Sequence, residues 1–142
     1  MSKSDAFENS LLKLIFNGTT IAGLADNTAA TPLTNLYVSL HTADPGETGT
    51  QATSEIAYTN YSRVAVARDG TGWVVTANSV SPAANIDFPT GTGGSGTAAF
   101  FAIGTQATGA GVILYSGAIA PTIVTGNGVT PRLSTSSTIT ED

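Results

Sequence analysis

The chain contains no cysteine and few charged residues. The absence of cysteine excludes disulfides, thiolate zinc sites and a cysteine nucleophile. Charged residues make up 11% of the sequence, against about 25% in an average soluble protein. The few cations form no basic run along which a phosphate backbone could lie; they are Lys3, Lys13, Arg63, Arg68 and Arg132. Nucleic-acid binding is therefore not expected.

Long apolar runs are missing as well. Residues 1–5 lack the apolar core of a secretion signal, and no later run approaches the roughly 20 residues of a membrane span. We expect a protein that is made in the cytosol and stays soluble, without a membrane partner, until it assembles. A weakly charged surface can be buried against other protein at little desolvation cost, which favours an assembly subunit over a freely diffusing enzyme.

The length of 142 residues fits one domain, 1–142, without a linker or an internal repeat. A helix is predicted from about residue 6 to residue 16, because Asp5 and Glu8 have the spacing of a capping box and Asn17-Gly18 is a stop signal. Its apolar side is wide and must pack on the chain's own sheet, the favoured alternative, or on a neighbouring subunit. That side comprises Phe7, Leu11, Leu14 and Ile15, flanked by Leu12 and Phe16.

After a loop over residues 19–34, the rest of the chain predicts short strands separated by glycine-bearing turns. The expected strands are 36–42, 61–68, 73–77, 85–88, 98–104, 112–116, 119–124 and 133–140. Pro121 falls inside one of them and places it at a sheet edge. We therefore predict an all-β fold, a jelly-roll-like β-sandwich of about seven or eight strands with one N-terminal helix.

The segment from Leu36 to Gly49 alternates apolar and polar residues and then enters a turn at Asp44-Pro45-Gly46. This pattern predicts a half-buried strand followed by an exposed loop. The same segment, with Tyr61-Ser62-Arg63-Val64-Ala65-Val66 and Asn85-Ile86-Asp87-Phe88-Pro89 downstream, resembles a family of small tailed-bacteriophage virion proteins. Members of that family are labelled tail-fibre or head-decoration proteins. The resemblance extends from Phe7 to Thr140.

The resemblance implies a non-enzymatic structural protein of the virion, made in the host cytoplasm. Its first implication is a capsid decoration or cement protein that binds the major capsid protein of the assembled shell. The alternative is a tail-fibre or baseplate subunit involved in host contact. A homo-oligomer is expected in either case, and a trimer fits both roles. A small hydrolase on a β-sandwich, the third hypothesis, needs clustered acids or a histidine partner that the sequence does not offer.

Each motif that matches an enzyme fails on its context, so we expect neither catalysis nor a cofactor. Residues 91–96 satisfy G-x-G-x-x-G, but a strand rather than a helix is predicted to follow. Ser10-Leu11-Leu12-Lys13 matches S-x-x-K without the partner motifs. His41 is predicted to be a strand residue that bonds a neighbouring strand or faces solvent. Asp44 and Glu47 are predicted to be solvated turn residues rather than a Ca²⁺ site, so no metal is assigned.

The sequence also offers candidates for contact with partners. The helix supplies three apolar residues, and two adjacent phenylalanines in a strand face opposite sides, so that one of them needs covering. Two arginines flank a strand at odd spacing, which predicts one internal pair and one contact with a partner. The interface candidates are Leu11, Ile15, Phe16, Phe100, Phe101, Arg63 and Arg68. Trp73 is either a core residue or an exposed anchor.

Overall fold

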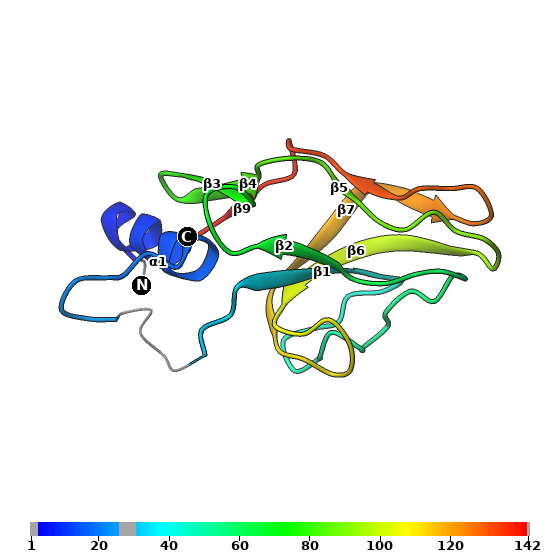
Figure 1. Ribbon diagram of the computed structural model, residues 1–142, viewed down its shortest axis with the longest axis horizontal. Coiled ribbons are helices and arrows are strands. Elements are labelled where there is room, and N and C mark those ends of the chain that lie inside the picture. The colour runs from blue at the N-terminus through cyan, green and yellow to red at the C-terminus, as the bar shows by residue number, and fades with distance from the viewer. Residues whose placement is uncertain (1–2, 26–30, 142) are drawn as a thin grey trace. The chain divides into compact units, whose positions relative to one another are not determined.

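The computed structural model describes residues 3–25 and 31–141, which form one helix and nine strands (Figure 1). Residues 26–30 of the expected 19–34 loop lie outside the described residues. The elements are α1 (Asp5–Asn17), β1 (Asn35–His41), β2 (Val64–Ala67), β3 (Trp73–Thr76), β4 (Ser79–Pro82), β5 (Ile86–Asp87), β6 (Gly96–Gly104), β7 (Ile113–Thr125), β8 (Arg132–Leu133) and β9 (Ile139–Thr140). The predicted all-β class with one helix is confirmed, while the jelly-roll arrangement stays a prediction.

The chain divides into two compact units. The first contains residues 1–35, 66–85 and 134–142, and the second contains residues 36–65 and 86–133. The first unit is therefore assembled from three separate stretches of sequence. The expectation of a single domain over residues 1–142 stays a prediction.

The second unit carries most of a four-stranded sheet with the order β2-β1-β6-β7. Its central strand β1 is buried on both faces: Leu36, Val38 and Leu40 are at most 1% exposed on one face, and Ser39 and His41 are 0% exposed on the other. The expected half-buried strand is thus wrong. The reason is the long connection after β1, which folds back over the polar face and supplies hydrogen-bond partners for it.

Strand β7 replaces the two strands expected over residues 112–116 and 119–124. It pairs antiparallel with β6, with Tyr115 opposite Ile103 and Ile123 opposite Ala98. The register shifts between Ala98 and Phe100, opposite the stretch of β7 that contains Pro121. Strand β7 is the last in the sheet order, so the edge position predicted from Pro121 is confirmed.

The first unit combines α1 with a small sheet of order β3-β4-β9. The helix ends as predicted, because Gly18 adopts the left-handed conformation at φ 64°. The predicted capping box is wrong: the N-cap is Ser4, which makes no side-chain cap hydrogen bond. The apolar stripe is also shifted, since Leu12 and Phe16 are 0% exposed whereas Phe7 is 37% exposed.

The helix packs on its own unit rather than standing free. The Phe16 ring contacts Trp73 edge to face with ring centroids 5.0 Å apart, and Asn17 Nδ2 donates to the Trp73 carbonyl at 3.1 Å. Trp73 is 2% exposed, so it is a core residue. Packing of the helix on the chain's own sheet, the alternative favoured from sequence, is therefore confirmed.

Several short strands differ from their predicted bounds. The expected strand 61–68 is β2 alone, and the expected strand 85–88 is the two-residue β5, which pairs with β8. The expected strand 133–140 is two separate strands, since β8 pairs with β5 and β9 pairs with β4. Strand β4 was not predicted, because its serines and its proline carry no strand signal.

Candidate functional site

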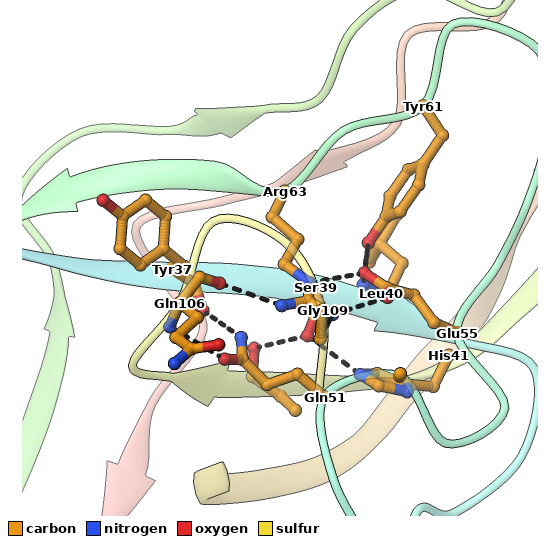
Figure 2. A network of polar contacts seen from close by, with 12 residues as sticks. Tyr37, Ser39, Leu40, His41, Gln51, Glu55, Tyr61, Arg63, Gln106 and Gly109 are labelled. Carbon is orange, nitrogen blue, oxygen red and sulfur yellow. Dashed lines mark hydrogen bonds and ion pairs between the residues drawn. The ribbon is translucent and has the colours of Figure 1, made fainter. Parts of the chain in front are cut away.

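A group of buried polar contacts in the second unit surrounds Glu55 and Arg63 (Figure 2). Arg63 Nε and Nη2 each lie 2.7 Å from a different carboxylate oxygen of Glu55. The Arg63 side chain is 3% exposed and that of Glu55 is 18% exposed. The hydrogen bond with Glu55 raises the pKa of Arg63. Such a two-contact pair is the most directional form of an arginine–carboxylate interaction.

The guanidinium of Arg63 also binds the connection between β6 and β7. Its Nη1 donates to the Gln106 carbonyl at 2.9 Å, and its Nη2 donates to the Gly109 carbonyl at 2.7 Å. Both carbonyls belong to residues 105–112, which join the two strands. Arg63 therefore ties this connection to the one that follows β1.

Tyr61 adds a third side chain to the pair. Its hydroxyl donates to Glu55 Oε1 at 2.9 Å and accepts from the Leu40 backbone N–H at 3.1 Å. Burial raises the pKa of Tyr61, so the hydroxyl remains protonated and keeps its role as a donor. Glu55 is thereby linked to the middle of β1.

Gln51 also links the connection that follows β1 to the connection between β6 and β7. It is 0% exposed; its Nε2 donates to the Tyr37 carbonyl at 3.2 Å, and its Oε1 accepts from the Gln106 N–H at 3.0 Å. A Cβ at Gly104 would lie 2.2 Å from Gln51 Cδ, and a Cβ at Gly111 would lie 2.3 Å from Gln51 Oε1. Two glycines thus make the space for this side chain. We call Gln51, Glu55, Tyr61 and Arg63 the Glu55 cluster.

Ser39 and His41 form a separate buried pair. His41 Nε2 lies 2.9 Å from Ser39 Oγ, and His41 Nδ1 lies 2.8 Å from the Thr53 carbonyl. Since a carbonyl can only accept, Nδ1 carries the proton and Nε2 of the neutral ring accepts from Ser39. Burial is the main cause that lowers the pKa of His41. His41 is a strand residue as predicted, but its side-chain hydrogen-bond partners lie in its own strand and in the following connection, and not in a neighbouring strand or in solvent.

The Ser39–His41 distance is that of a nucleophile and its base. Both residues are 0% exposed. The contacts satisfy polar groups on the second face of β1, which would otherwise be buried without partners. The pair, like the Glu55 cluster, serves to hold loops on the sheet.

The turn that contains Asp44 and Glu47 lies at the surface. Both residues are exposed, and Asp44 Oδ1 accepts from the Gly46 N–H at 2.9 Å, as expected of a turn aspartate. Within residues 3–25 and 31–141, no group of three or more histidine, aspartate and glutamate residues is placed to hold a metal ion. The two carboxylates line an open cleft of about 540 Å³ beside residues 111–116.

The two motif matches behave as their contexts predicted. Residues 91–96 lead into strand β6 and not into a helix. Ser10 lies within α1, where its hydroxyl donates to the Ala6 carbonyl at 2.8 Å.

The interface candidates of the first unit gather around the C-terminal half of α1. Leu11 and Ile15 are half-buried, and Phe16 is fully buried against Trp73. Arg68 Nε donates to the Ile15 carbonyl at 2.6 Å, where a cation also complements the helix dipole. Arg68 is thus hydrogen-bonded within the first unit. An interface role for Leu11, Ile15, Phe16 and Arg68 stays a prediction.

The candidates of the second unit lie on β6 and beside it. Phe100 is paired with His41 and Phe101 with Leu40, so the two rings face opposite sides of the sheet as predicted, and both are half-buried. A Cβ on Gly117 would lie 2.9 Å from the Phe101 ring. Arg63 is the internally paired arginine that the spacing predicted. An interface role for the two phenylalanines stays a prediction.

Sequence reasoning missed Gln51, Glu55 and Tyr61. A signal was present in part, because Tyr61 and Arg63 are two residues apart and therefore share a side in extended chain. Nothing in their spacing pointed to Glu55 or Gln106 as partners, since these contacts depend on the path of two loops. The cluster is visible only in three dimensions.

Comparison with known proteins places the chain in a family. Residues 2–140 match the family described as Podophage GP4 fiber I protein gp80. No curated protein sequence matches the chain. In the part of the chain that the structure describes, no helix is both long and apolar enough to cross a membrane.

Proposed function

The chain belongs to the Podophage GP4 fiber I protein gp80 family, a family of structural proteins of the bacteriophage virion, and on that premise we propose that it is a fibre subunit that acts by binding. The match over residues 2–140 carries this proposal, since it covers nearly the whole chain. The first expectation from sequence, a capsid decoration protein, has weaker support, because the family is described as a fibre protein.

The contacts of the Glu55 cluster support a binding role. Glu55 bonds Tyr61 and Arg63 within the cluster. The other three side chains bond backbone groups of Tyr37, Leu40, Gln106 and Gly109, and so hold two long connections on one sheet. A loop fixed in this way loses little conformational entropy when it binds a partner. The two residues with nucleophile and base chemistry, Ser39 and His41, are buried.

The partners that this proposal implies are other proteins of the virion. The surface has few charges to desolvate, which lowers the cost of burying it against a neighbour. A homo-oligomer, with a trimer as one arrangement, synthesis in the host cytoplasm and a jelly-roll-like β-sandwich belong to the same proposal. Host contact through the fibre is its functional consequence.

The proposal is tested by counting and locating the chain in purified particles. Quantitative mass spectrometry should find a small number of copies relative to the major shell protein, and gold-labelled antibodies should mark the tail in electron micrographs. Copies at the scale of the shell protein, with label over the capsid, would instead support a decoration protein. Absence of the chain from the particle would refute both virion roles.

A further inference from the structure

An asparagine is followed directly by a glycine at two places in the chain, Asn17-Gly18 and Asn127-Gly128. At such a step the backbone nitrogen of the glycine can attack the side-chain amide of the asparagine, because glycine has no Cβ to obstruct the approach. The attack needs a side chain that can turn toward the backbone, and a glycine nitrogen that is released from its hydrogen bond. The structure gives the two steps different surroundings.

The first step is held in place by the packing of α1. The Asn17 side chain is half-buried, and its Nδ2 donates to the Trp73 carbonyl at 3.1 Å. The Gly18 N–H donates to the Lys13 carbonyl in the cap that ends the helix. An attack on Asn17 would have to break both hydrogen bonds and unwind the end of a helix whose Phe16 is 0% exposed. We therefore expect Asn17 to be protected in the folded chain.

The second step lies in a surface turn that follows β7 in the second unit. The turn spans residues 126–129, and the Val129 N–H closes it by donating to the Gly126 carbonyl at 3.1 Å. Gly128 has a φ of 77°, which favours glycine at this place in the turn. Asn127 and Gly128 are both exposed, so solvent reaches the two groups that would react.

A hydrogen bond to the neighbouring loop restrains the glycine nitrogen of this turn. The Gly128 N–H donates to the Gly91 carbonyl at 2.8 Å, which ties the turn to the connection between β5 and β6. The two segments lie close together, because a Cβ at Gly91 would collide with the Gly126 carbonyl oxygen. A local opening of the turn frees the Gly128 nitrogen without disturbing a packed helix, and such an opening costs much less than global unfolding.

We propose that Asn127 is a site of spontaneous deamidation, controlled by the hydrogen bond between Gly128 and Gly91. When the turn opens, the Gly128 nitrogen loses its proton to hydroxide from the solvent and forms a bond to Asn127 Cγ. The bond between Cγ and Nδ2 breaks, and Nδ2 takes a proton from water and leaves as ammonia. Water then opens the cyclic imide at either of its carbonyls, and the product is an aspartate or an isoaspartate at residue 127.

The product carries charge in a part of the chain that has none. No charged residue or histidine occurs from Phe88 to Pro131, and the formal net charge would change from −5 to −6. An exposed carboxylate makes the turn more costly to bury against another protein. The modification itself goes beyond the proposed fibre role and does not depend on it.

Mass spectrometry of tryptic fragments tests the proposal on the purified chain. Trypsin separates the two sites, because Asn17 falls in fragment 14–63 and Asn127 in fragment 69–132. After incubation of the folded chain at mildly alkaline pH, fragment ions should locate a gain of about one mass unit at Asn127 and none at Asn17. The variant Asn127→Gln should lose this gain. An unmodified Asn127, or an equal gain at Asn17, would overturn the proposal.

The same incubation in urea separates protection by the fold from the chemistry of the local sequence. Unfolding releases both glycine nitrogens, so Asn17 should then react at a rate similar to that of Asn127. If Asn127 alone still reacts in urea, the local sequence selects the site and the structural assignment is wrong. In the folded natural chain, the Gly128 N–H should exchange with solvent deuterium about tenfold faster or more than the Gly18 N–H. Equal exchange of the two would contradict opening of the turn.

A pair of glycine variants tests the control by the turn. Gly91→Ala presses a Cβ against the Gly126 carbonyl, so Asn127 should react about fivefold faster or more, the effect of weakening about one hydrogen bond. Gly70→Ala is the matched control, because a Cβ there meets nothing within 4 Å, and it should leave the rate unchanged. An unchanged rate in Gly91→Ala, or equal acceleration in both variants, would refute control by the turn.

These outcomes are separable from those of the proposed function. Deamidation is measured on the chain without particles, so its failure would leave the copy number and tail location untouched. A chain located in the capsid could still deamidate at Asn127.

Discussion

Arg63 holds both carboxylate oxygens of Glu55 at 2.7 Å in a site where the arginine side chain is 3% exposed. The ion pair between Arg132 and Asp87 has the same two-contact form, but its side chains are 56% and 44% exposed. The two pairs thus differ in their access to water and in the two carbonyls, of Gln106 and Gly109, to which Arg63 also donates. The exposed pair serves as a comparison for the buried one.

Arg63→Ala should lower the free energy of unfolding by about 3 kcal/mol, because it leaves a partly buried carboxylate and two carbonyls without their donor. Urea denaturation monitored by tryptophan fluorescence measures the change. Arg132→Ala, at the exposed pair, should cause little or no loss. A similar effect of the two substitutions would contradict the structural role assigned to the Glu55 cluster.

Gly104→Ala should destabilise the chain by about 1–3 kcal/mol, since the added Cβ would lie 2.2 Å from Gln51 Cδ and the buried glutamine has no room to retreat. Gly70→Ala is the control, because a Cβ there meets nothing within 4 Å. Thermal unfolding should show a lower midpoint for Gly104→Ala alone. Unchanged midpoints for both variants would show that Gln51 is not packed as described.

Stability should fall with pH below about 6.5, in part because of His41. Burial lowers its pKa in the folded chain from the ordinary value of 6.5, so the unfolded state binds the proton first as pH falls. The contribution of the neutral ring is complete above 6.5 and is lost between that value and the lower folded pKa. Denaturation at several pH values should give a shallower dependence for His41→Gln than for the natural chain; identical slopes would exclude His41 as the cause.

Leu12→Ala should cost about 2–5 kcal/mol, because Leu12 is 0% exposed and its removal leaves a cavity beneath α1. Lys13→Ala changes the next residue on the exposed side of the helix and should stay within about 0.5 kcal/mol. Equilibrium denaturation compares the two. Equal losses would mean that the helix does not pack through this stripe.

The elements that the sequence predicts best are those with strong local signals. α1 combines helical periodicity with the Asn17-Gly18 stop, and β1 alternates cleanly, so both were placed within a residue or two. The phase of the helix stripe was wrong because Phe7, Leu11 and Ile15 look as apolar as Leu12 and Phe16. Only the position of Trp73 in space decides which side is covered.

The polar contacts could not be predicted in the same way. Gln106 lies 55 residues after its partner Gln51, and no local pattern links them. The burial of His41 follows from a loop that covers what an alternating pattern marks as the solvent face. The sequence indicated that Arg63 would pair internally, but its acceptors depend on the folded path of residues 105–112.

The division of the chain into interleaved units has a consequence for the order in which they can be completed. The second unit draws on no residue after 133, whereas the first needs β9, at residues 139–140, to pair with β4, at residues 79–82. The helix α1 can already contact Trp73 of β3 before that, but the small sheet gains its third strand only from the last residues of the first unit.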